Sequence, residues 1–150
     1  MLRWTVLMTL SILAACGGDA PCGVSWDGAE PELGTMVLSD GTTLSNGSWD
    51  TTRINAGTLT LDVRAMGEET TLRDALSAGE MPVCRTLDDQ NDQVIYQDNG
   101  PWITNSSHTG TLAITEFSDE SVKGQFTVTL RSTTGDTREL SGAFHVAPAR

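Results

Sequence analysis

Two histidines are the first side chains in this sequence that could carry out proton-transfer chemistry. His108 follows Ser106 and Ser107 in a stretch rich in Gly, Asn and Ser, and His145 falls on the predicted outer face of the last strand. A serine, a histidine and an aspartate could form a hydrolytic triad, but a triad is defined by geometry, and the chain has no Gly-x-Ser-x-Gly motif. A two-histidine metal site would need a carboxylate as well. We expect surface histidines and no enzymatic activity.

The densest carboxylate cluster is Asp88-Asp89-Gln90-Asn91-Asp92. Oxygen atoms of Asp88, Asp89 and Asp92 could bind calcium, which prefers hard oxygen ligands. Counted from Asp88, however, the run lacks the glycine at the sixth position and the glutamate at the twelfth position of an EF-hand loop. We therefore expect a solvated loop and no cofactor, with a calcium-stabilised surface module as an alternative.

Three of the four tryptophans, Trp26, Trp49 and Trp102, lie in segments rich in turn-forming residues. Trp26 and Trp49 each stand in a Ser-Trp-Asp sequence. Exposed indole rings beside Asp and Asn side chains can bind sugar rings, which would make these residues a ligand platform. The alternative, which we favour, is that the rings close the open ends of a β fold as part of its core.

The first fifteen residues have the organisation of an export signal. Arg3 precedes a ten-residue apolar stretch, 4–13, which is too short to span a membrane. The stretch ends in Leu13-Ala14-Ala15-Cys16, which resembles the lipobox of bacterial lipoproteins. That resemblance implies cleavage before Cys16 and a lipid on its sulfur. In many lipoproteins of this kind, an aspartate directly after the cysteine retains the protein at the inner membrane. This chain has Gly17 there, so the resemblance favours the outer membrane as its location. An ordinary signal peptide cleaved near Ala15 is the alternative.

The lipobox resemblance leaves two cysteines for other chemistry, Cys22 and Cys84. We expect a disulfide between them, as suits an oxidising periplasm or cell surface. The bond would close a loop of about sixty residues and would tie the N-terminal tether to the fold. A two-cysteine metal or redox site is less consistent with the sequence, because there is no Cys-x-x-Cys spacing.

The central part of the chain combines strand patterns with one helix. Segments 36–39 and 42–45 flank Asp40-Gly41, a hairpin-turn sequence. Residues 58–65 alternate apolar and polar side chains, and 94–96 are a further strand. Thr71 to Ala78 is the one expected helix, with Thr71 as its N-cap.

The last forty residues carry the clearest pattern. Segments 109–117, 122–131 and 138–146 predict three consecutive antiparallel strands, a meander, with one packed and one solvated face. The predicted inward side chains are those of Leu112, Ile114, Val122, Phe126, Val128, Leu130, Leu140, Phe144 and Val146. The fold expected is all-β: an antiparallel β-sandwich or flattened β-barrel of about seven to nine strands.

Each strand of this meander contains a short motif. The first strand begins with Gly110-Thr111, the second contains Val122-x-Gly124-x-Phe126, and the third contains Gly142-x-Phe144-x-Val146. They resemble small bacterial lipoprotein domains without an assigned function. The resemblance implies an all-β cell-envelope domain and brings no catalytic residues with it. We expect a signal peptide in residues 1–15, a lipidated tether and linker in 16–34, and one β domain in 35–150.

The net charge of the chain limits the classes of molecule that it can bind. The formal net charge is −11, and it becomes −12 once Arg3 leaves with the signal peptide. Nucleic acid and anionic membrane surfaces repel such a chain. We therefore expect a non-catalytic, lipid-anchored envelope domain that contacts the membrane through its lipid and binds a protein or glycan. The alternatives are a calcium-stabilised or glycan-binding module and an envelope hydrolase.

Overall fold

The computed structural model describes residues 20–63, 72–88 and 92–150 of the 150-residue chain. Strands dominate this part of the chain. In chain order the elements are η1 (Pro21–Gly23), β1 (Thr35–Leu38), β2 (Thr43–Leu44), β3 (Ser48–Trp49), β4 (Arg53–Ala56), β5 (Leu59–Val63), α1 (Leu72–Ala78), β6 (Val83–Leu87), β7 (Asp92–Gln97), β8 (Pro101–Ile103), β9 (Gly110–Phe117), β10 (Val122–Ser132) and β11 (Thr137–Pro148).

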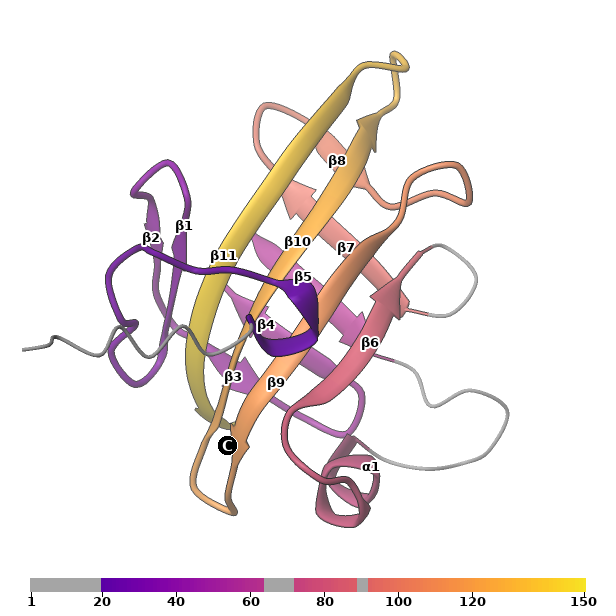
Figure 1. Ribbon diagram of the computed structural model, residues 1–150. Coiled ribbons are helices and arrows are strands. Elements are labelled where there is room, and N and C mark those ends of the chain that lie inside the picture. The colour runs from indigo at the N-terminus through magenta and orange to yellow at the C-terminus, as the bar shows by residue number, and fades with distance from the viewer. Residues whose placement is uncertain (1–19, 64–71, 89–91) are drawn as a thin grey trace, which may run out of the picture.

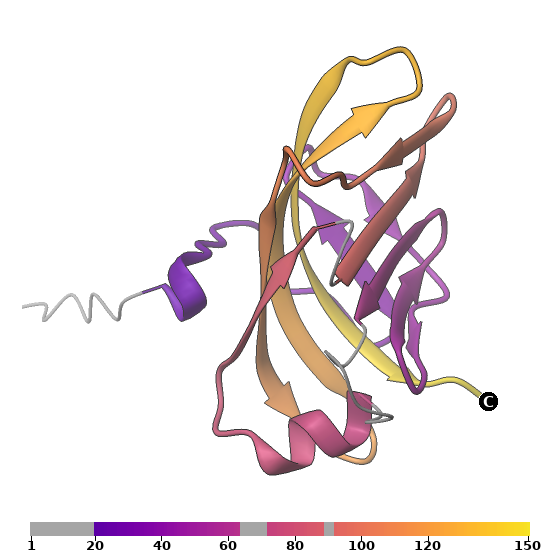
Figure 2. The ribbon, with the colours of Figure 1, turned by 90° about the vertical axis from the view of Figure 1, so that its right-hand side faces the viewer.

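The strands form two layers that enclose the core (Figure 1). The front sheet has the order β2-β1-β11-β10-β9-β6, and the rear sheet, β3-β4-β5-β7-β8, crosses behind it. Neighbouring strands within each sheet are antiparallel. Figure 2 views the layers from the side, with α1 at one end of the space between them.

Two corners join the layers into a flattened barrel. β11 pairs with β3 through Ala147 and Ser48, and β10 pairs with β8 through Arg131 and Ile103. The predicted all-β fold is therefore confirmed. The prediction that pairing is antiparallel is wrong at one corner, because β3 runs parallel to β11. The β1–β2 hairpin leaves β2 running in the direction of β11, and residues 45–47 lead into β3 without a reversal.

The predicted C-terminal meander is confirmed as β9, β10 and β11. Its expected inward side chains are buried: Leu112, Ile114, Val122, Phe126, Val128, Leu130, Leu140, Phe144 and Val146. They share one cluster with buried residues of the rear sheet and with Leu76 of α1. Clean alternation of apolar and polar residues therefore identified the buried face correctly, because every second side chain of a strand points to the same side.

Reciprocal glycine–phenylalanine pairs explain the motifs of the meander. Gly124 is the register partner of Phe144, and Phe126 is the partner of Gly142. A Cβ atom on Gly124 would come to 2.5 Å from the Phe144 ring, and one on Gly142 would come to 3.0 Å from the Phe126 ring. Each glycine therefore leaves room for the aromatic ring of its cross-strand partner.

Other predicted elements are also present. The Asp40-Gly41 hairpin joins β1 and β2, and β5 and β7 lie within or around the predicted strands. The predicted helix is α1, although its expected cap, Thr71, lies outside the described residues. The prediction missed β3, β4, β6 and β8, which span only two to five residues each. So few residues give too short a pattern for periodicity to identify.

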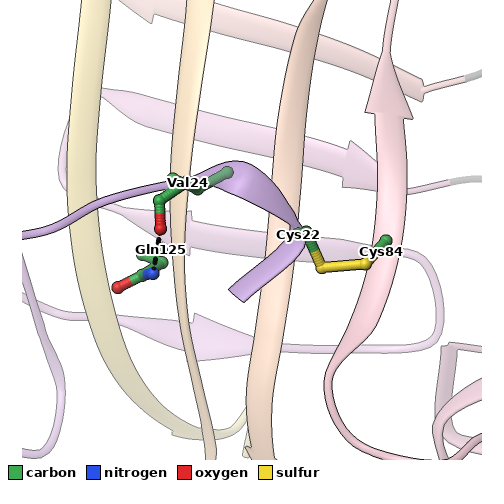
Figure 3. The surroundings of a disulfide bond; sticks show 4 residues. All are labelled: Cys22, Val24, Cys84 and Gln125. Carbon is green, nitrogen blue, oxygen red and sulfur yellow. Dashed lines mark hydrogen bonds between the residues drawn. A yellow bond between two sulfur atoms is a disulfide. The ribbon is translucent and has the colours of Figure 1, made fainter. Parts of the chain in front are cut away.

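Residues 20–31, here called the strap, cross the face of the front sheet (Figure 1) on its outer side (Figure 2). Cys22 in η1 forms the predicted disulfide with Cys84 of β6 (Figure 3), so that prediction is confirmed. Two residues later, the carbonyl oxygen of Val24 accepts a hydrogen bond of 2.5 Å from Nε2 of Gln125. Val24 is only 2% exposed. The described part of the expected linker is therefore packed against the sheet.

One row of residues across the front sheet receives the strap. Cys84 pairs with Ala113, Ala113 with Gln125, and Gln125 with Ala143. Cys84 and Gln125 are the two attachment points, and the alanines between and beside them are buried although their strand neighbours Leu112 and Phe144 face the core. Small side chains at these positions let the strap lie close to the sheet.

Candidate functional site

The structure separates the three tryptophans that were considered as one ligand platform. Trp49 lies in β3 near the end of the barrel that carries α1, Trp102 lies in β8 and packs partly buried against the core, and Trp26 belongs to the strap. The core interpretation is confirmed for Trp49, which is 3% exposed. The rings therefore do not form one continuous surface, and any ligand site must be built around a single tryptophan.

Two neighbours, Phe117 and Arg73, pack against the Trp49 ring. Phe117, at the end of β9, meets its ring edge-on with the centroids 5.7 Å apart. The guanidinium of Arg73 lies over the ring, 5.1 Å from the centroid, in a cation–π arrangement. Arg73 in turn forms an ion pair with Asp119 in the β9–β10 turn. Helix α1 thus places a positive charge over the indole at this end of the barrel.

A pocket of about 330 Å³ opens beside this ring. Its described lining consists of Trp49, Asp50, Thr51, Arg73, Pro148 and Ala149. The backbone N–H of Ala149 donates a 2.7 Å hydrogen bond to the carbonyl oxygen of Trp49, which fixes the end of the chain beside β3. Chain segments that are distant in sequence therefore meet at one site.

The β3–β4 turn supplies the polar rim of the pocket. Oδ1 of Asp50 accepts backbone hydrogen bonds from Thr52 (3.0 Å) and Arg53 (2.9 Å). This side-chain cap holds the turn, and Asp50 itself remains exposed. Oδ2 of the same carboxylate takes part in neither bond. Thr51 is also exposed and adds a hydroxyl group that can donate and accept.

The indole Nε1 of Trp49 is a buried donor with no hydrogen-bond partner among the described residues. Leaving such a donor unpaired costs about 1–3 kcal/mol. Most buried polar groups in proteins have a hydrogen-bond partner. An unpaired donor beside a pocket is therefore a place where a bound molecule could supply the missing acceptor.

The opposite end of the barrel carries a second arginine–aromatic cluster. Nη1 of Arg138 donates a 2.5 Å hydrogen bond to Oδ2 of Asp98, and its guanidinium lies 5.3 Å from the ring centroid of Tyr96 and 5.8 Å from that of Trp102. Trp102 donates from Nε1 to the carbonyl oxygen of Asp98 at 3.1 Å. These contacts join β11 to the β7–β8 hairpin and close this end. The groups are mutually satisfied, which is typical of a structural cluster.

The electrostatics of this second cluster agree with that role. The hydrogen bond to Asp98 raises the pKa of Arg138. Burial raises the pKa of Tyr96, which is 6% exposed. In the nearby β1–β2 turn, the backbone N–H of Thr42 lowers the pKa of Asp40. Arg138 and Tyr96 therefore each keep the proton they carry at neutral pH more firmly than usual.

The structure does not bring the two histidines into one described constellation. His108 lies in the β8–β9 loop, where Nδ1 contacts Oδ1 of Asn105 at 2.9 Å. His145 is half-buried on β11, and its register partners are Thr35 and Lys123. In the ranges 20–63, 72–88 and 92–150, no group of three or more His, Cys, Asp or Glu side chains could hold a metal ion.

The remaining predicted sites fall partly or wholly outside the described residues. Cys16, the expected lipidation site, precedes residue 20. Of the calcium candidates, Asp89 lies outside the described ranges, Asp88 follows β6, and Asp92 begins β7. Lipidation and calcium binding therefore stay predictions.

Comparison with models of known families, with curated proteins and with solved structures found no match to this chain. No helix in the described part of the chain is both long enough and apolar enough to cross a membrane.

Sequence analysis did not identify most of the residues that line the Trp49 pocket. Trp49 was singled out, and Asp50 belongs to its Ser-Trp-Asp sequence. Arg73, Pro148 and Ala149 carried no signal, because only the folded chain brings them beside Trp49. The Arg138 cluster was missed for the same reason.

Proposed function

We propose that this protein is a lipid-anchored binding module of the bacterial cell envelope, without catalytic activity. The observation that carries the proposal is the attachment of the strap to the front sheet through Cys22 and Cys84. The lipobox-like sequence ends at Cys16, six residues before Cys22. A domain that begins so close after its expected anchor has the arrangement that suits a membrane-tethered module.

The short tether limits where the domain can stand. Six extended residues reach at most about 20 Å, so lipid on Cys16 would hold η1 within that distance of the bilayer surface. The strap lies on the outer face of the front sheet, and that face would therefore turn toward the membrane. The rear sheet and the two ends of the barrel would remain accessible to a ligand.

Charge and redox chemistry support the same proposal. With a net charge of −12 after signal removal, the domain would be repelled by anionic lipid headgroups, so its attachment to a membrane would depend on the covalent lipid. The disulfide suits an oxidising compartment outside the cytoplasm.

Intact mass of the protein purified from its native bacterium tests the proposal. We expect a chain that begins at Cys16 with an acyl-sized mass increase and that partitions into detergent. The Cys16→Ala variant should lose the added mass, whereas a Cys22→Ala variant should retain it. A wild-type chain without added mass, or a lipid that persists in Cys16→Ala, would refute the anchor.

A further inference from the structure

The pocket beside Trp49 combines an apolar wall with a mixed polar rim. Pro148 and Ala149 provide the wall, and the hydrogen bond from Ala149 to Trp49 holds that wall in place. Apolar surface of this kind packs against the C–H face of a sugar ring, while a few fixed polar groups select its hydroxyls.

The rim offers hydrogen-bonding groups of both kinds. Asp50 presents Oδ2 as an acceptor, since Oδ1 already binds the turn. Arg73 has five N–H donors, of which one contacts Asp119, and Thr51 can donate or accept. A ligand with several hydroxyl groups, each both donor and acceptor, could satisfy all three side chains together.

The charges of the described residues at the pocket favour a neutral ligand. Among them, Arg73 is paired with Asp119, and Asp50 adds a second negative charge, so these three groups sum to −1 on a chain of −11. A phosphate or carboxylate would meet repulsion there. A cation would find the indole face of Trp49 already covered by the guanidinium of Arg73.

The volume limits the size of the ligand. About 330 Å³ lies at the lower end of the range of small-molecule pockets. That space suits one or two sugar rings and is too small for several rings of a longer glycan.

From these features we infer that the Trp49 pocket binds the end of a neutral saccharide, one or two rings in length. This inference deepens the binding part of the proposed function. It does not depend on the lipid, so the pocket and the anchor can fail independently in their separate tests.

The test is a titration of the full chain, isotopically labelled and kept in a detergent without a sugar headgroup. The probes are glucose, N-acetylglucosamine, cellobiose and N,N′-diacetylchitobiose, with inorganic phosphate as the anionic comparison. The readout is the indole N–H resonance of Trp49, with those of Trp26 and Trp102 as internal references. Probes are taken to about 50 mM, which is enough to saturate a site whose Kd is about 1 mM. We expect at least one saccharide to shift the Trp49 signal saturably and to leave that of Trp102 in place.

Asp50→Asn is the decisive variant. Asparagine keeps an oxygen that caps the β3–β4 turn, but it replaces the second acceptor with a donor. We expect binding to weaken about tenfold, as for loss of one hydrogen bond to a charged group. Asp40→Asn is the matched control, because Oδ1 of Asp40 caps the β1–β2 turn in the same way, through the N–H of Thr42, and Asp40 does not line the pocket.

Three results would overturn the inference. In the first, the Trp49 signal stays fixed with every saccharide. A second is a shift with phosphate alone. In the third, Asp50→Asn weakens binding of the best saccharide no more than Asp40→Asn does, which would place the ligand elsewhere.

Discussion

Loss of the strap disulfide should be the most informative single perturbation of stability. The bond joins Cys22 to Cys84 across a sequence separation of 62. In the chain-entropy model, releasing a loop of this length stabilises the unfolded state by about 4 kcal/mol. A domain of this size has a total stability of about 5–15 kcal/mol, so the loss is a large fraction of it.

The test is urea unfolding of the double variant Cys22→Ala, Cys84→Ala, which leaves neither partner as an unpaired thiol. We expect the free energy of unfolding to fall by about 4 kcal/mol and Tm to fall by about 10 °C. The m-value should rise, because an unfolded chain without the crosslink exposes more surface.

A separate variant distinguishes the crosslink from the contacts of the strap. Gln125→Ala removes the hydrogen bond to Val24 and leaves the disulfide intact. We expect it to cost about 1 kcal/mol with an unchanged m-value. If the double cysteine variant loses less than about 1 kcal/mol, the reasoning from loop entropy is refuted for this protein.

Further predictions concern the core and the Arg138 cluster. Phe126→Ala should lower the free energy of unfolding by about 3–5 kcal/mol in urea, because the ring is fully buried; a loss under about 1 kcal/mol would contradict its placement. Gly124→Ala should cost about 1–3 kcal/mol, since the added methyl would clash with the backbone carbonyl oxygen of Ala113 and with the Phe144 ring, and an unchanged urea midpoint would contradict this close packing. Tyr96 is the chain's one tyrosine, so phenolate absorbance should show it ionising above the ordinary pKa of 10.0 in the folded protein, and stability should fall as pH rises through that folded pKa. Arg138→Gln should raise this pKa further, because the positive charge lowers it; a downward shift would oppose the assignment.

Local patterns predicted the long strands well. β9, β10 and β11 each span eight or more residues, so their alternation is long enough to define a buried face. The Asp40-Gly41 turn was equally recognisable, because turn chemistry is carried by adjacent residues.

Long-range features were not predictable in the same way. The corner between β11 and β3 joins residues about a hundred positions apart through only two register pairs. The buried outer-face positions Ala113 and Ala143 look unremarkable in sequence, and only the strap that covers them gives them a role. The pocket follows the same rule: Trp49 stood out by residue type, but Arg73 and Pro148 reach it through tertiary folding.

The disulfide also determines how the chain would carry mechanical load. A pull applied between the two ends passes from Cys22 directly to Cys84, so the covalent path bypasses everything between them, including β1 to β5 and α1. When fully extended, the oxidised chain would be shorter than the reduced chain by the 62-residue loop, or about 200 Å of contour length. Across the front sheet the force would pass from β6, which holds Cys84, through β9 and β10 to β11, while the enclosed loop would lie outside the loaded covalent path.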